Sequence, residues 1–214
     1  MMNASSINTI LLLVVLINMF IMGSNRIITA IKAVALQGII LALLAFFSEE
    51  FTPKGTILFL IIVSIKGIII PMLLIRATKL AEINQEMHPL IGYMPTMFID
   101  ALSVFLSFFI SQKLPLLPAH QETIIVPVFF ATLMSGMILI IARQKAITQV
   151  IGYLIMENGV YILSSMLTGS VTFLAEIGVL LDVLAGVFIM GIMLNHISTT
   201  FDKGDVGKLT SLRE

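Results

Sequence analysis

Hydrophobic residues of this chain come in long blocks that short polar stretches separate. An α-helix needs about 20 apolar residues to cross a bilayer. Seven blocks approach that length: 5–23, 28–47, 56–75, 91–111, 122–142, 147–168 and 172–195. Apolar and polar residues do not alternate within the blocks, so the pattern does not favour a transmembrane β-barrel. The sequence therefore predicts an all-α, polytopic membrane protein with seven transmembrane helices.

The polar stretches between the blocks predict the organisation of the chain. The segment Leu114–Pro118 contains two prolines and cannot continue a regular helix, so it ends the fourth span. We expect a four-helix part over 1–118, a three-helix part over 119–198 and a polar cytoplasmic tail over 199–214. The first block has no basic segment before it and no clear cleavage site, which favours a spanning helix over a signal peptide.

Basic residues predict the orientation in the membrane. Lys and Arg accumulate in short cytoplasmic loops. With the N-terminus outside, the outer segments hold only Lys54 and Lys113, and Lys66 lies within the membrane. The inner segments then hold all the others: Arg26, Lys32, Arg76, Lys79, Arg143, Lys145, Lys203, Lys208 and Arg213. We therefore expect a multi-pass protein of the cell inner (cytoplasmic) membrane, with its N-terminus outside and its C-terminus in the cytoplasm.

Composition excludes several classes of function. Charged residues make up 11% of the chain, whereas soluble domains have about 25%. The formal net charge of zero gives no indication of nucleic-acid binding. There is no cysteine, which excludes disulfides, thiolate catalysis and iron–sulfur ligation from this chain. His88, His120 and His196 are scattered near predicted helix ends, and no phosphate loop or Ser/His/Asp set is present. We expect no catalytic residue, cofactor or metal on this chain.

Four ionisable residues lie inside the apolar blocks, at Lys66, Asp100, Glu157 and Asp182. A charge at the centre of a bilayer costs about 2.5–3.5 kcal/mol on insertion scales, so such residues usually bind or move ions. Lys66 precedes Pro71, whose missing N–H should free a backbone carbonyl and make a polar, hydrated spot. The alternatives for Lys66 are a structural ion pair or a side chain that reaches the membrane surface.

Glu157 has an aromatic residue on each side at helical spacing. Tyr153 and Tyr161 lie four residues before and after it, so both should share its helix face. Gly152 and Gly159 lie on a different face, where they would let another helix approach closely. The helix should thus pack on one side and present a carboxylate on another. The alternative is a glutamate that only hydrogen-bonds to a neighbouring helix.

The last span adds two acidic residues. Glu176 precedes Asp182 by six residues and lies closer to the outer end, as a further proton site or as an interfacial residue. Asp100 is a further candidate, although Pro95 should draw it toward the cytoplasmic interface. Carboxylates with a lysine, without a metal site or a nucleophile, indicate proton transfer. The predicted proton-transfer residues are Glu157, Asp182, Lys66 and Glu176, with Tyr153, Tyr161 and Asp100 as further candidates.

The three-helix part resembles the K subunit of complex I and the C subunit of multi-subunit cation/proton antiporters. The resemblance rests on Arg143, on Gly152 followed by Glu157 and Asn158, and on Asp182 followed by Gly186. In that family each of two helices carries a buried glutamate of the proton path. Here the first acid stands five residues after the glycine, where the family usually has two, and the second is an aspartate.

The longer chain resembles the hydrogenase-4 component E family. Met156–Gly159, the helix from Glu176 to Asp182 and the tail around Asp205 and Lys208 carry this resemblance, and Lys66 with Pro71 is similar to the third helix of that family. The resemblance covers nearly the whole chain and is most specific over 143–214.

The resemblance implies a non-catalytic membrane-arm subunit of a complex-I-like nickel–iron hydrogenase of the formate hydrogenlyase type. The nickel–iron centre and iron–sulfur clusters would lie on partner subunits. The implied partners are antiporter-like subunits, other membrane-arm subunits, a peripheral hydrogenase module and the lipid bilayer. Glu157 and Asp182 would be successive proton sites that Lys66 tunes. The alternatives are a cation/proton antiporter subunit, a structural connector, a free-standing ion transporter and a seven-helix receptor.

Overall fold

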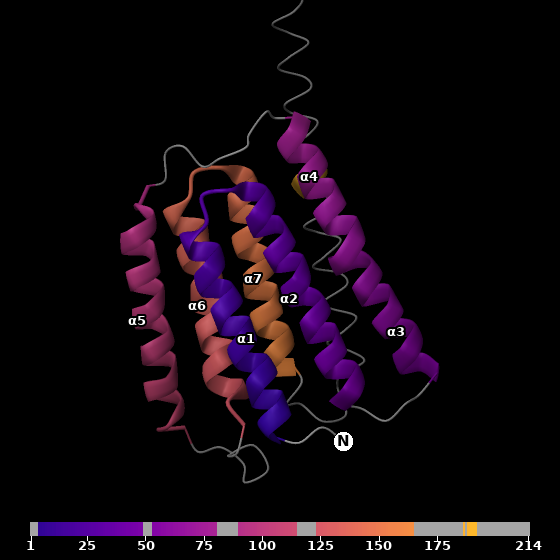
Figure 1. Ribbon diagram of the computed structural model, residues 1–214, viewed down its shortest axis with the longest axis vertical. Coiled ribbons are helices and arrows are strands. Elements are labelled where there is room, and N and C mark those ends of the chain that lie inside the picture. Colours follow the sequence, from indigo (N-terminus) through magenta and orange to yellow (C-terminus); the bar gives the residue numbers. More distant parts are fainter. Residues whose placement is uncertain are drawn as a thin grey trace, which may run out of the picture.

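A computed structural model describes residues 4–48, 53–80, 90–114, 123–164, 186 and 188–191. Its regular elements are helices, which confirms the predicted all-α class. They are α1 (Ala4–Gly23), α2 (Ile27–Ser48), α3 (Pro53–Ser64), the π-helix η1 (Ile65–Ile69), α4 (Ile70–Leu80), α5 (Tyr93–Ser111), α6 (Ile125–Ala142) and α7 (Ala146–Ser164). Helices α3 and α4 follow each other through η1 as a single rod (Figure 1).

Within the described residues, six helices are long and apolar enough to cross a membrane. They correspond to the first six predicted spans. The largest difference concerns the third span, predicted over 56–75, which is helical from Pro53 to Leu80. Hydropathy drops at the polar residues of both ends, but proline suits a first helical turn and the charges at the other end continue the helix. The seventh span, 172–195, lies outside the described residues apart from residues 186 and 188–191, which are helical.

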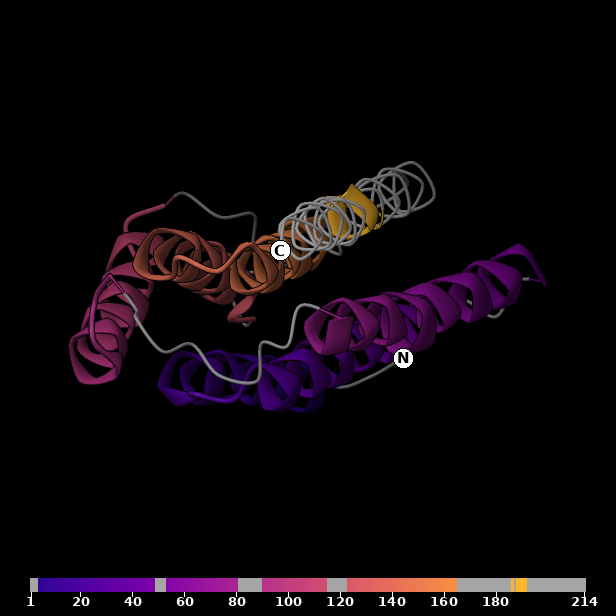
Figure 2. The same ribbon diagram turned by 90° about the horizontal axis from the view of Figure 1, so that it is seen from above.

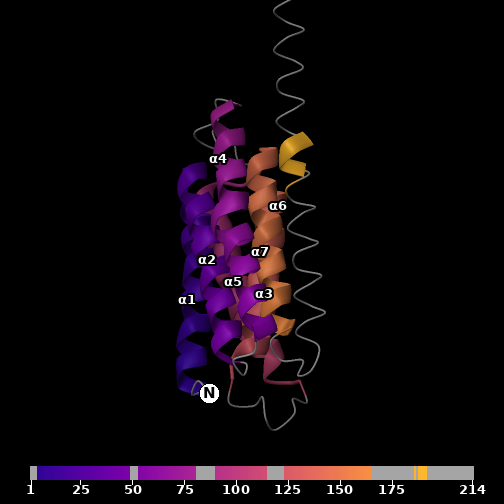
Figure 3. The ribbon, with the colours of Figure 1, turned by 90° about the vertical axis from the view of Figure 1, so that its right-hand side faces the viewer.

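The helices form two rows. Figure 2 shows α1, α2 and the α3–α4 rod in one row, with α6 and α7 in a second row beside it and α5 at one end. Helix α6 packs most extensively on α7, and it also contacts α1 and α5, while α2 contacts both α7 and the rod. Figure 3 shows that the helices run side by side along one direction. The predicted parts 1–118 and 119–198 therefore pack against each other within the bundle.

Glycines allow α6 and α7 to approach closely. A Cβ atom at Gly136 would lie 2.6 Å from the carbonyl oxygen of Gly152, and one at Gly152 would lie 2.8 Å from that of Gly136. A Cβ at Gly159 would lie 3.1 Å from the backbone nitrogen of Leu133. The prediction that Gly152 and Gly159 admit another helix is thus confirmed, and α6 is that helix.

The outer surface carries large apolar side chains. On α5, Phe98 is 74% exposed and Phe105 is 68% exposed, and on α1 Leu16 is 61% exposed. Exposed apolar area of this extent is rare on soluble monomers. The hydrocarbon of a bilayer would cover it without cost, as expected for a polytopic membrane protein.

Candidate proton-transfer site

Lys66 lies in a π-helix that precedes Pro71. Between Ile65 and Ile69 the backbone is wider than an α-helix, and the N–H of Ile70 donates to the carbonyl oxygen of Ile65. Proline cannot donate the next hydrogen bond, so the helix accommodates the defect in this turn. Short π-helical turns of this kind are frequent at functional sites. The disturbance that Pro71 predicted is therefore present, and Lys66 lies inside it.

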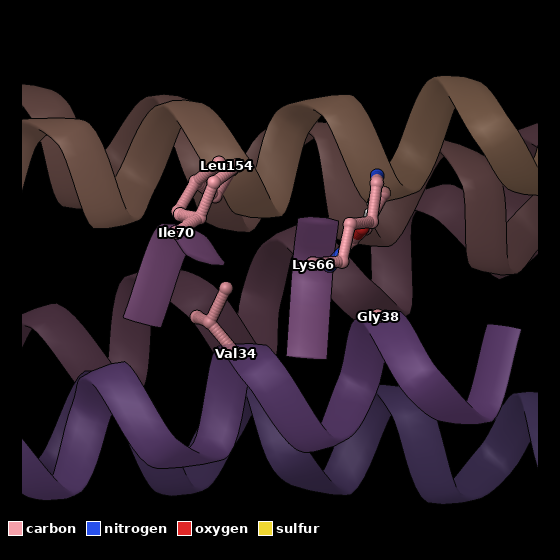
Figure 4. A pocket seen from close by; sticks show the side chains of 6 residues that line it. Val34, Gly38, Lys66, Ile70 and Leu154 are labelled. Atoms are coloured by element: carbon pink, nitrogen blue, oxygen red, sulfur yellow. Dashed lines mark hydrogen bonds between the residues drawn. The ribbon is translucent and has the colours of Figure 1, made fainter. Parts of the chain in front are cut away.

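The side chain of Lys66 passes close to α2 on its way to α7. A Cβ atom at Gly38 would lie 3.2 Å from the Cβ atom of Lys66, so glycine at this position leaves room for the lysine stem. Figure 4 shows Lys66 between Gly38 of α2 and the helix that carries Leu154. The cavity drawn there has a volume of about 10 Å³, the lower limit for one water molecule.

Lys66 and Glu157 form an ion pair. The Lys66 Nζ atom lies 2.6 Å from Glu157 Oε1, and the two side chains are 10% and 2% exposed. Lys66 Nζ also donates a hydrogen bond to Asn158 Oδ1 at 3.1 Å, and it lies 5.6 Å from the ring centroid of Tyr161. An aromatic face at this distance attracts a cation. The structure thus brings together Lys66, Glu157 and Tyr161, three of the residues that the sequence predicted.

A line of buried polar side chains continues from this ion pair. Asn158 Nδ2 donates to Gln37 Oε1 at 3.4 Å, Gln37 Nε2 donates to Asn18 Oδ1 at 3.0 Å, and Asn18 Nδ2 donates to Thr132 Oγ1 at 3.2 Å. These four residues lie on α7, α2, α1 and α6, and each is at most 2% exposed. We name the residues from Lys66 to Thr132 the polar line.

The sequence reasoning missed three members of the polar line, Asn18, Gln37 and Thr132. Their signal was nonetheless present, because Asn18 and Gln37 are amides in the middle of apolar blocks. Such side chains in membrane helices commonly hydrogen-bond to neighbouring helices. The sequence identified only the charged residues of the same blocks.

Asp100 lies inside α5 and is fully buried. The hydroxyl group of Ser135 on α6 donates a hydrogen bond to Asp100 Oδ1 at 2.6 Å. Among the described residues, Asp100 Oδ2 has no hydrogen-bond partner. Pro95 belongs to the first turn of α5, where a helix tolerates proline, and α5 continues unbroken from Tyr93 to Ser111. Proline therefore does not interrupt the span that carries Asp100.

The remaining predicted residues have different settings. Tyr153 packs against the apolar cluster that contains Ile151 and Ile155. Asp182 and Glu176 lie outside the described residues. Within the described ranges, no group of three or more His, Cys, Asp or Glu side chains could hold a metal ion.

Arg143, which contributes to the family resemblance, lies buried at the end of α6. Its Nη2 atom donates to the carbonyl oxygen of Met22 at 3.1 Å, and its guanidinium carbon lies 4.1 Å from the ring centroid of Tyr93. Arg143 thus connects the end of α6 to the end of α1 and the start of α5.

Comparisons with known proteins found relatives in bacteria. Over 154 residues, the chain is 28% identical to the uncharacterized protein Rv0085 of Mycobacterium tuberculosis, which covers 72% of this chain and 70% of that protein. It is 27% identical over 150 residues to hydrogenase-4 component E of Escherichia coli (strain K12) and of Shigella flexneri, which covers 69% of this chain and 68% of each relative. These relatives confirm the resemblance to the hydrogenase-4 component E family. No family model matches the chain. No solved structure matches it either.

Proposed function

We propose that this chain is a membrane subunit of a hydrogenase complex, and that its ion pair of Lys66 and Glu157 takes part in proton translocation. The similarity to hydrogenase-4 component E supports membership in such a complex. The contact of 2.6 Å between Lys66 Nζ and Glu157 Oε1, buried inside predicted membrane spans, is the observation that carries the proton role. Ionisable residues in this setting commonly form proton relays.

The ion pair can exist in two forms that differ by the place of one proton. In the first form, Lys66 is an ammonium and Glu157 is a carboxylate. In the second, the N–H bond breaks, an O–H bond forms at Glu157 Oε1, and both groups are neutral. Both forms have the same net charge, so a change of local field or hydration is enough to shift the balance between them. Movement of the surrounding helices, driven by electron transfer in partner subunits, would supply that change.

The other predicted residues extend this path. Asp182 would be the next proton site after Glu157, and Glu176 would be a station nearer the outer end of the last span. The phenol groups of Tyr153 and Tyr161 flank Glu157 in the sequence, and Tyr161 lies beside Lys66 in the structure. The chain would act in the cell inner membrane, beside antiporter-like and other membrane-arm subunits. The peripheral module would carry the nickel–iron centre and the iron–sulfur clusters.

The first test is the substitution Glu157→Gln in the complete complex. Glutamine keeps the size of the side chain but cannot exchange a proton, so we expect proton translocation to fall about tenfold or more. Hydrogen turnover with an artificial electron carrier should remain. Proton uptake by inverted membrane vesicles, measured with a pH-sensitive dye, gives the result.

The matched control is Thr78→Val. Thr78 is fully buried, and its hydroxyl group donates only within its own helix, to the carbonyl oxygen of Leu74 at 2.7 Å. We expect this variant to translocate protons as the wild type does. A Glu157→Gln complex that assembles and still translocates at the wild-type rate would refute the proton role of Glu157.

A second candidate function is a role in a cation/proton antiporter complex, which the resemblance to the antiporter C subunit favours. Purification in mild detergent through a C-terminal tag, followed by metal analysis and identification of the partners, separates the two. Nickel, iron and antiporter-like subunits in one particle support the hydrogenase complex. Antiporter-like subunits without nickel would instead favour an antiporter.

A further inference from the structure

The polar line leads from the ion pair to a second buried carboxyl group. Its last member, Thr132, lies on α6 one helical turn before Ser135, and residues at this spacing are neighbours on a helix surface. Ser135 donates to Asp100 Oδ1 at 2.6 Å. Figure 2 shows α5 and the α3–α4 rod at opposite ends of the bundle. Buried polar groups therefore extend from Lys66 on one side of the protein to Asp100 on the other.

The hydrogen bonds of the polar line all point the same way. An ammonium group has donors and no acceptor, so Asn158 must turn its oxygen toward Lys66 and its NH₂ group toward Gln37. Gln37 and Asn18 repeat this arrangement, each with its oxygen on the side of Lys66. The three amide dipoles are thus aligned. Their alignment favours a positive charge at the end with Lys66 and a negative charge at the opposite end, beyond Thr132.

Asp100 is the ionisable group at that opposite end. It is fully buried, and Asp100 Oδ2 has no hydrogen-bond partner among the described residues. The helices α1 and α6, which pack against α5, contain no titratable residue, and the only other titratable residue on α5 is Tyr93. A static ion pair needs a cation, and none of these three helices provides one for Asp100. Its unpartnered oxygen instead suits a group that binds and releases a proton.

We propose that Asp100 is a second proton-binding site, coupled to Lys66 and Glu157 through the aligned amides of the polar line. This inference rests on the proposed function. When Lys66 loses its proton, the positive charge that favours a negative charge at Asp100 disappears. Asp100 then takes up a proton from water, with formation of an O–H bond at Oδ2, and returns it to water when Lys66 is charged again. The amides keep their own protons and transmit only the electric field.

The experiment measures proton translocation by the complete complex with Asp100→Asn and Asp100→Glu. Asparagine retains an oxygen that accepts the Ser135 hydrogen bond but cannot exchange a proton, so translocation should fall about tenfold or more. Glutamate restores a carboxyl group and should recover part of the activity. Wild-type translocation in Asp100→Asn would overturn the inference. If Glu157→Gln loses translocation while Asp100→Asn retains it, the proposed function stands and only this inference fails.

Infrared spectroscopy of the purified complex tests the site directly and does not depend on the assembly of the Asp100 variants. The carbonyl band of a protonated carboxylic acid should appear as the pH is lowered, and Ser135→Ala should shift its frequency because Ser135 donates to Asp100. Gln37→Met, which interrupts the polar line, should move the pH at which this band appears, and Thr78→Val should not. Identical spectra and titrations in wild type, Ser135→Ala and Gln37→Met would overturn the inference.

Discussion

At the scale of the residue, the ion pair joins two side chains that are far apart in the sequence. Both Lys66 and Glu157 could be selected from the sequence, because a charge inside an apolar block is conspicuous. Their contact could not be predicted, since it depends on which helices are neighbours and how each is rotated. The static ion pair and the proton-exchanging pair share this geometry, so only a comparison of stability with transport separates them.

Removal of one partner should destabilise the protein more than removal of both. Lys66→Met leaves the Glu157 carboxylate buried without a cation, and the loss of one partner of a buried pair costs about 3–5 kcal/mol. We expect the double variant Lys66→Met/Glu157→Gln to recover most of the thermal stability but no proton translocation. Thermal denaturation of the purified complex and the vesicle assay measure the two effects. Recovery of translocation in the double variant would indicate a structural ion pair.

At the scale of the element, the third span is the least regular helix that the structure describes. Pro71 and its missing N–H predicted a disturbance near Lys66, and the π-helix Ile65–Ile69 is that disturbance. The sequence could not distinguish a π-helix from a kink or a broken helix, because each removes the same hydrogen bond. The choice depends on the contacts of the surrounding turns, such as the close approach between Gly67 and Ile39 of α2.

Substitution of Pro71 should affect transport without a loss of stability. Pro71→Ala restores a backbone N–H and relieves a strain of up to about 3 kcal/mol, so Ile65–Ile69 should become more α-helical. The rotation of Lys66 relative to Glu157 would then change, and we expect proton translocation to fall about tenfold or more, because proton transfer requires close positioning. The vesicle assay and thermal denaturation test this. Pro95→Ala, in the first turn of α5, is the control and should behave as the wild type.

At the scale of the whole molecule, the close packing of α6 on α7 positions the site. Gly136 and Gly152 bring the two backbones together, while Glu157 and Asn158 of α7 project toward Lys66. Thr132 and Ser135 of α6 connect the same helix pair to α1 and α5. A change in the spacing of α6 and α7 should therefore disturb both halves of the polar network.

Gly152→Ala tests this packing. The added methyl group would lie 2.8 Å from the Gly136 carbonyl oxygen and 2.8 Å from Ile140 Cγ1, so the helices must separate. Overpacking of this kind costs about 1–3 kcal/mol. We expect a lower midpoint of thermal denaturation together with reduced proton translocation. Gly92→Ala, whose new methyl group meets only Pro95 at 3.5 Å, is the control, and an equal loss in both variants would contradict the packing argument.

The sequence by itself determined the class of the protein and most of its spans. The reason is that a bilayer requires long apolar helices, and that requirement is local and visible in the order of residues. The same local reasoning identified Lys66, Glu157 and the close-packing face at Gly152. The positions of Asp182 and Glu176 and the orientation in the membrane stay predictions.

Only the tertiary structure decided which polar groups meet. Asn18, Gln37 and Thr132 are ordinary neutral residues in the sequence, and each becomes part of a hydrogen-bonded line because α1, α2, α6 and α7 lie side by side. The connection of Ser135 to Asp100 has the same origin. Helical periodicity places a residue on a face, but the packing of the helices decides which partner that face meets.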